Sequence, residues 1–159
     1  MMQENLIELI TNKDEWVLSE GENDGYPFIL RFRPHLGPFI DSKIYNIRLI
    51  VIGPYQSESE NLMLMSDKQS FFFKKLEDAI ILEVEHDLKA ILAFVYTGNN
   101  QREWHFYTND LEEMEVRLNK ILGEMDYPEL IDLQFDNDPD WEEYCAVIAG
   151  AIDDEENVS

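Results

Sequence analysis

From residue 44 onward, apolar residues recur with either a strand period or a helix period. The order of the segments that show each period restricts the chain to few folds. Stretches with strand character alternate with stretches whose apolar residues recur at helical spacing. In chain order they predict a strand at 44–52, a helix from 66 to about 80, a hairpin at 90–108, a helix at 109–122 and a strand at 131–136. The resulting order is strand, helix, strand, strand, helix, strand.

Capping residues mark the starts of the two predicted helices. Ser66 with Gln69 has the form of a capping box, and Asn109 with Glu112 is expected to cap the second helix, which Gly123 ends. The apolar residues of the second helix fall on one stripe. Each helix therefore has one face suited to packing on a sheet.

The N-terminal part adds further elements to this order. Residues 5–11 can form a short helical turn, and residues 16–18 and 26–33 predict two strands joined by a long polar turn at 20–25. The predicted fold class is therefore α+β. We expect a ferredoxin-like split βαβ sandwich, an antiparallel sheet with two helices on one face, plus an N-terminal β-hairpin.

The chain length and the cysteine count favour one domain in a reducing compartment. A chain of 159 residues can bury a core without disulfides or bound metals to stabilise it, so we expect a single domain over residues 1–150 and an acidic flexible tail at 151–159. Cys145, the one cysteine, is expected inside the core. No apolar run approaches the ~20 residues that span a bilayer, and no basic leader precedes one, which favours a cytoplasmic location without membrane contact.

The charge balance limits the partners that the protein can bind. Thirty-four acidic and twelve basic side chains give a formal charge of -22, which repels nucleic-acid phosphates. Direct nucleic-acid binding is therefore not expected. The acidity serves solubility alone, or it forms a docking surface for a basic protein, and the sequence leaves both interpretations open.

Several short motifs appear in an order that resembles DUF695, a family of uncharacterised bacterial domains. The resemblance covers about Glu15 to Tyr144. The motifs are Asp14-Glu15-Trp16, Asp24-Gly25-Tyr26-Pro27, Leu76-Glu77-Asp78, Arg102-Glu103-Trp104-His105-Phe106-Tyr107 and Asp138-Pro139-Asp140-Trp141-Glu142-Glu143-Tyr144. The segment 61–66 departs from the family pattern, so any role of that loop does not carry over.

The resemblance implies a fold and a bacterial cytosolic setting, but no activity, because the family has none assigned. More loosely, the acidic split βαβ plan is similar to the regulator B family, which inhibits ribonuclease E by protein contact. That similarity is an analogy between folds.

A metal site and a catalytic site are both poorly supported by the residues. Asp136, Asp138 and Asp140 alternate like the start of a calcium loop, but Trp141 stands where such a loop needs glycine and Val147 where it needs a bidentate glutamate. A capping role for Asp138 is the simpler interpretation. The three histidines are dispersed, and neither a nucleophile elbow nor a glycine-rich phosphate loop occurs. We therefore expect no catalytic, cofactor or metal residues, although an enzyme is not excluded.

These observations favour a non-catalytic acidic protein-interaction module. It would be an inhibitor or immunity-type regulator of a basic partner such as a nuclease, acting as a monomer or weak homodimer. The candidate interaction residues are Trp104, Tyr107, Asp132, Asp136, Asp138 and Asp140, with the aromatic ones expected on an exposed strand face. The alternative is a hydrolase, or a binder of a small molecule or divalent metal, that uses the carboxylates of residues 136–143.

Overall fold

The structure, a computed structural model, is built on one six-stranded antiparallel sheet. It describes residues 2–57, 59–60, 62, 65–126 and 131–158 and, within these, the side chains of residues 5–151. The strands lie in the order β1-β2-β4-β5-β3-β6, and each neighbouring pair is antiparallel. The predicted α+β class is therefore confirmed.

The helices and strands account for most of the described chain. The strands are β1 (Val17–Asn23), β2 (Tyr26–Phe32), β3 (Ile47–Pro54), β4 (Ala90–Gly98), β5 (Gln101–Thr108) and β6 (Asp132–Asn137). The helices are α1 (Met2–Leu9), α2 (Gly37–Asp41), α3 (Asp67–Glu85), α4 (Leu111–Glu124) and α5 (Glu142–Val158).

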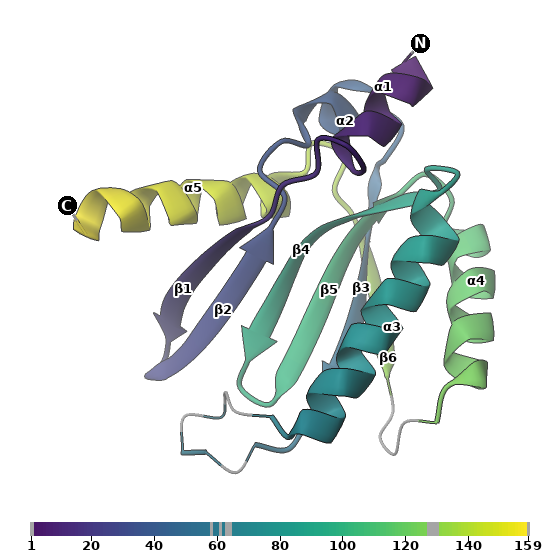
Figure 1. Cartoon of the computed structure of the whole chain (residues 1–159). Coiled ribbons are helices and arrows are strands. Elements are labelled where there is room, and N and C mark those ends of the chain that lie inside the picture. Colours follow the sequence, from purple (N-terminus) through teal and green to yellow (C-terminus); the bar gives the residue numbers. More distant parts are fainter. Residues whose placement is uncertain (1, 58, 61, 63–64, 127–130, 159) are drawn as a thin grey trace.

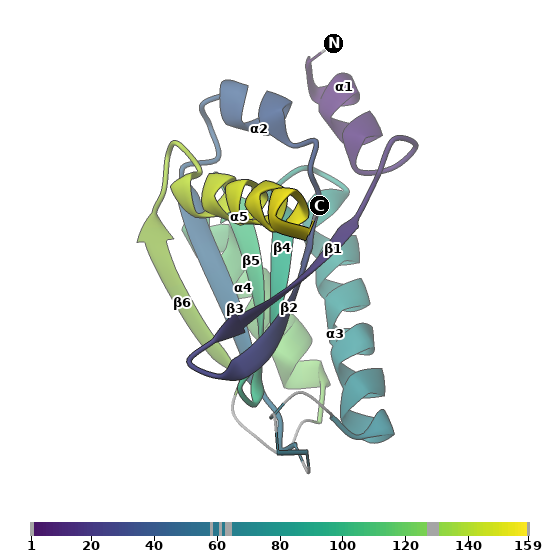
Figure 2. The same cartoon turned by 90° about the vertical axis from the view of Figure 1, so that its left-hand side faces the viewer.

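The segment from β3 to β6 has the connectivity β-α-β-β-α-β, and its strands lie in the order β6-β3-β5-β4. This arrangement is compatible with the ferredoxin-like fold. The β1–β2 hairpin extends the sheet next to β4. Helices α3 and α4 cover one face, whereas α5 crosses the other, and α1 and α2 lie toward one end of the sheet (Figures 1 and 2).

The N-terminal hairpin closes with a tighter turn than the sequence suggested. We expected a long loop at 20–25, but β1 continues to Asn23, which pairs with Tyr26. Asp24 and Gly25 form the whole connection, with φ values of 51° and 85°. An Asp-Gly pair with positive φ matches the right-handed twist of the strands, so a two-residue turn replaces the expected loop.

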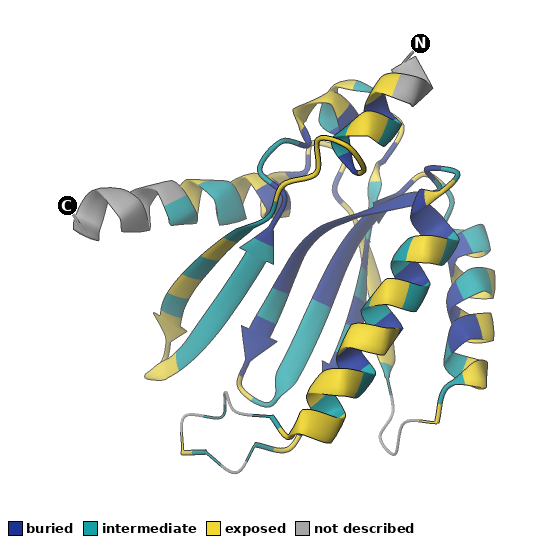
Figure 3. Cartoon of the chain, in the orientation of Figure 1, coloured by how far each residue is buried: buried dark blue, intermediate teal, exposed yellow. Residues whose placement is uncertain are grey.

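The first hydrophobic core lies between the sheet and the α3–α4 layer. It contains Phe73, Leu76 and Ile80 from α3 and Met114 and Leu118 from α4, all buried. Figure 3 shows buried positions on both of these helices and along the strands that they cover. The capping box of Ser66 and Gln69 starts α3 as predicted. For α4 the predicted cap was one residue early, because the Asp110 carboxylate, and not Asn109, accepts from the Glu113 N–H.

A second core lies on the opposite face of the sheet, under α1, α2 and α5. Trp141 and Tyr144 are buried there. Cys145, the next residue of α5, is exposed, so its predicted burial is wrong, because its side chain faces away from the sheet. Residues 151–158, predicted as a tail, are the last part of α5.

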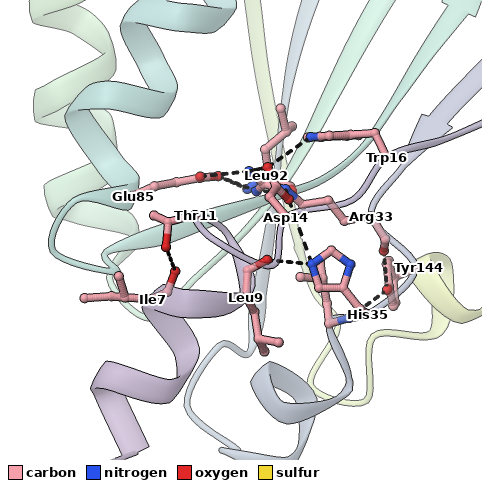
Figure 4. Close-up of polar contacts among 11 residues, drawn as sticks. Ile7, Leu9, Thr11, Asp14, Trp16, Arg33, His35, Glu85, Leu92 and Tyr144 are labelled. Atoms are coloured by element: carbon pink, nitrogen blue, oxygen red, sulfur yellow. Dashed lines mark hydrogen bonds and ion pairs between the residues drawn. The ribbon is translucent and has the colours of Figure 1, made fainter.

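A buried ionic network joins the N-terminal segment, β2, β4 and α3 (Figure 4). The Arg33 guanidinium is 2% exposed and donates to both carboxylate oxygens of Glu85, to Asp14 and to the Leu92 carbonyl. Glu85 also accepts from the Leu92 N–H at 2.9 Å. Burial would lower the pKa of Arg33, but the carboxylates of Glu85 and Asp14 outweigh it and raise the pKa, which keeps the guanidinium charged.

Replacing Glu85 with alanine should destabilise the protein by about 3–5 kcal/mol, because it leaves the buried Arg33 charge without its main partner. The measurement is the free energy of unfolding from urea denaturation. Glu115→Ala on α4, an exposed site, is the matched control and should change this free energy by less than about 0.5 kcal/mol. Equal effects of the two variants would contradict the structural role of the network.

Candidate binding cleft between α5 and the sheet

Helix α5 is fastened over the sheet by a polar cluster at its first turn. The buried Asp138 carboxylate accepts from the Tyr107 hydroxyl at 2.7 Å and from the N–H groups of Glu142 and Glu143 at 2.8 and 3.2 Å. It thus satisfies two amides that the start of a helix leaves open. Burial, together with the bond to Asp138, raises the pKa of Tyr107, so its hydroxyl remains a donor.

Two aromatic side chains complete this fastening. The Trp141 ring stacks on Tyr107 with ring centroids 3.9 Å apart, and its Nε1 donates to the Tyr45 carbonyl at 2.9 Å. The Tyr144 hydroxyl donates to the Arg33 carbonyl and accepts from the Leu36 N–H. Trp141 holds a φ of 56°, an unfavourable value for a bulky residue that these contacts stabilise. The direction of α5 is therefore set by its first turn.

A cleft of about 780 Å³ lies between α5 and the sheet. One wall is formed by Glu143, Val147 and Ala151 of α5. The sheet side carries side chains from β1 to β5 that are aromatic or polar apart from Leu30: Ser19, Glu22, Asn23, Phe28, Leu30, Arg48, Phe94, Tyr96, Gln101, Glu103 and His105. A cavity of this size, with aromatic walls and a few convergent polar groups, is typical of a ligand site.

A chain of hydrogen bonds crosses the floor of the cleft from β6 to β5. Arg48 donates to the two oxygens of Asp136 at 3.1 and 2.7 Å, and its Nη1 lies 3.0 Å from His105 Nδ1. His105 Nε2 lies 3.0 Å from Glu103 Oε1. Because a guanidinium only donates, Nδ1 must accept, so the proton is on Nε2 and is donated to Glu103. Both ring nitrogens of His105 are therefore engaged.

The electrostatics agree with this neutral form of the ring. Burial, with a further contribution from the positive charge of Arg48, lowers the pKa of His105 below 6.5. Burial alone would raise the pKa of Glu103, but hydrogen bonds from His105 and Gln101 and the charge of Arg48 outweigh it and lower the pKa. The cleft floor thus holds a neutral imidazole beside an ionised carboxylate.

The cleft has an excess of negative charge. Among the described lining residues, Glu22, Glu103 and Glu143 oppose a single guanidinium, that of Arg48, which Asp136 already pairs. Glu143 lies close enough to act electrostatically on both Arg48 and His105. Aromatic faces adjoin these charges, since Phe94 stacks on His105 at 4.1 Å and Phe28 lies 5.3 Å from Tyr96.

The structure separates the predicted interaction residues into two groups. Trp104 and Tyr107 are both 0% exposed, so the expectation that they lie on an exposed strand face is wrong. Both faces of β5 are covered, because Trp104 packs under α3 with its Nε1 on Glu77 and Tyr107 packs under Trp141. These side chains cannot contact a partner directly.

The four predicted aspartates have different surroundings. Asp138 is 6% exposed and serves the start of α5, in line with the predicted capping role. Asp136 is bound to Arg48 at the edge of the cleft, whereas Asp132 and Asp140 are exposed. The carboxylates of 136–143 therefore do not act as one cluster.

The residues that the sequence reasoning missed are Arg48, Glu103 and His105. Glu103 and His105 belong to a motif that was noted for its aromatics, and strand alternation could have placed both on one face with Tyr107. Arg48 carried no such signal, because its proximity to His105 depends on the pairing of β3 with β5.

The arrangement of the described residues also bears on metal and membrane binding. Within the described ranges, no group of three or more His, Cys, Asp or Glu side chains is arranged to hold a metal ion. No described helix combines the length and apolarity that a membrane crossing requires.

Comparison with known proteins places most of the chain in a family. Residues 14–147 match the sequence model of DUF695, which is described as a family of unknown function. No curated protein and no solved structure shows significant similarity to the chain.

The buried His105 should make stability fall as the pH drops below about 6.5. Its pKa is lowered in the folded state, so the unfolded chain binds the proton more readily and acid favours unfolding. His105→Gln should reduce the loss of unfolding free energy between pH 7.5 and 5.5, since glutamine can accept from Arg48 and donate to Glu103 without titrating. His86→Gln, at a side chain that is 60% exposed, should alter the pH profile less than His105→Gln does. A profile that His105→Gln does not alter would contradict this assignment.

Proposed function

The chain belongs to the DUF695 family, and because that family has no assigned activity, we propose a function from the cleft itself. The protein is a non-catalytic binding module whose α5 cleft receives a cationic side chain, arginine above all, of a basic partner protein. It keeps the inhibitor or immunity-type role and the bacterial cytoplasmic setting that the sequence analysis favoured. The similarity to the regulator B family remains an analogy between folds.

The observation that carries this proposal is the unbalanced negative charge of an aromatic-lined cavity. Glu103 and Glu143 provide carboxylate acceptors, and an incoming guanidinium can bind a carboxylate through two parallel hydrogen bonds. Phe28 and Tyr96 provide ring faces on which a cation is stabilised. The charge of -22 would guide a basic partner toward the protein over a longer range.

The arrangement of His105 favours recognition over catalysis. A general base needs a free ring nitrogen directed at the substrate, whereas both nitrogens of this ring are bound. Among the described lining residues, no serine or cysteine is hydrogen bonded to a base. The function we infer for His105 is to hold Arg48 and Glu103 in position.

The proposal is tested by titrating the protein with a short arginine-rich peptide and measuring the dissociation constant by calorimetry. Glu143→Gln should weaken binding at least tenfold, and Glu103→Gln should do the same. Binding should also weaken as salt rises from about 0.05 to 0.2 M, because exposed charges are screened over about 10 Å at 0.1 M.

The matched control is Glu115→Gln, the same charge change on the exposed surface of α4. It should leave the dissociation constant within twofold of the unmodified protein. If Glu143→Gln and Glu115→Gln weaken binding equally, the peptide is attracted to the overall charge and not to the cleft. If the peptide does not bind at all, the cationic-partner proposal is wrong.

A further inference from the structure

Two further hollows lie on the α3 side of the sheet, away from the α5 cleft. They measure about 340 and 430 Å³ and adjoin, because Arg31 and Arg102 line both. The strand alternation that directs Glu103 and His105 toward α5 directs Arg102 to this face. Two arginines thus meet in one hollow of a strongly acidic protein.

The two arginines differ in how they are neutralised. Arg31 forms a salt bridge with Glu77 and lies 4.7 Å over the Trp16 ring. Arg102 donates through Nε to the Thr97 hydroxyl at 2.9 Å and lies 5.6 Å from the centroid of the Phe73 ring. In the described part of the chain, no carboxylate forms a salt bridge with Arg102 and no acceptor takes a hydrogen bond from its Nη atoms.

In the hollow that Leu18 lines, the charge balance leaves about one positive charge, because Arg31 and Arg102 line it and Glu77 is paired with Arg31, whereas Asp67 and Lys74 line the adjoining hollow. Glu77 is shared, since it also accepts from Trp104 Nε1 at 2.9 Å, and it faces two guanidinium groups. Lys74 is paired with Asp78 on the exposed side of α3. Burial lowers the pKa of Arg102, and the charge of Arg31 lowers it further, which indicates that an anion placed here would be stabilised.

The hollow beside the arginines is apolar. Leu18, Ile29, Met65 and Val95 line it, and Leu18 is 63% exposed. Figure 1 shows the β1–β2 hairpin at the edge of the sheet, to the side of α3. A ligand that suits the whole hollow carries one negative charge at one end and an apolar body at the other.

We propose that Arg31 and Arg102 bind the head of an organic carboxylate, whose apolar chain lies along Leu18, Ile29, Met65 and Val95. A planar carboxylate matches the two free Nη donors of Arg102. A dianionic phosphate fits less well, because the hollow with the apolar lining has about one uncompensated positive charge and the carboxylates of Glu77 and Asp67 line the adjoining hollow. This site does not depend on the function proposed for the α5 cleft.

Octanoate is the probe, and its binding is measured by calorimetry and by the fluorescence of Trp16 beside Arg31. Arg102→Gln should weaken octanoate binding at least tenfold, and Arg102→Lys, which keeps the charge but loses the guanidinium fork, should weaken it by a smaller factor. Lys120→Gln, the same loss of charge on the exposed surface of α4, should change the affinity less than twofold. Octanamide, which has the same chain without the charge, should bind at least tenfold more weakly than octanoate.

A second variant tests the chain-binding part without touching the arginines. Leu18→Asn should weaken octanoate binding threefold or more, and circular dichroism checks that each variant remains folded. The proposal is overturned if octanoate does not bind, if octanamide binds equally well, or if Arg102→Gln leaves the affinity unchanged. Inorganic phosphate that binds more tightly than octanoate would overturn it as well, because the apolar hollow would then have no part in recognition.

Discussion

The buried ion pair between Arg33 and Glu85 is the interaction on which the other parts of the structure depend. Arg33 follows β2 and Glu85 ends α3, and the backbone of Leu92 on β4 is hydrogen bonded to both side chains. The guanidinium of Arg33 therefore links one helix to two strands. Asp14 brings in the segment before β1. A buried charge is tolerated only when its hydrogen bonds are nearly complete, which requires these elements to take their native positions together.

The same region positions α5 and hence the cleft. The Arg33 carbonyl accepts from Tyr144, whose ring packs edge-on against Trp141, and Trp141 in turn stacks on Tyr107. The Asp14-Glu15-Trp16 motif and the C-terminal motif, far apart in the sequence, therefore meet through Arg33. Their aromatic residues, with Asp14 and Asp138, hold the elements together, while the residues that line the cleft come from the strands between the motifs and from α5, Glu143 included. This division explains how a protein can keep a firm scaffold beside an open, charged cavity.

Strand β5 shows how one segment serves both faces of the sheet. Arg102, Trp104 and Phe106 face α3, whereas Glu103, His105 and Tyr107 face α5. The sequence distinguishes this motif by its aromatics and predicts an exposed face for Trp104 and Tyr107. It could not anticipate that α5 returns over the second face, because a strand with alternating polar and aromatic residues looks the same whether its far side faces water or a helix. The burial of Tyr107 and the engagement of His105 follow from that return.

The sequence by itself determined the elements from β3 to β6 and their order, because apolar periodicity and caps such as Ser66 and Gln69 are local properties of the chain. It also indicated the α+β class and the capping role of Asp138, but it did not predict α2 or α5. Only the tertiary structure decided which residues share a site. Arg48 lies beside His105 because of the register of β3 with β5. Arg31 and Arg102 line one hollow because β4 pairs with both β2 and β5, the strands that carry them. Such contacts join residues 57 and 71 positions apart, and no local pattern encodes them, because they are set by strand order and by the packing of helices on the two faces.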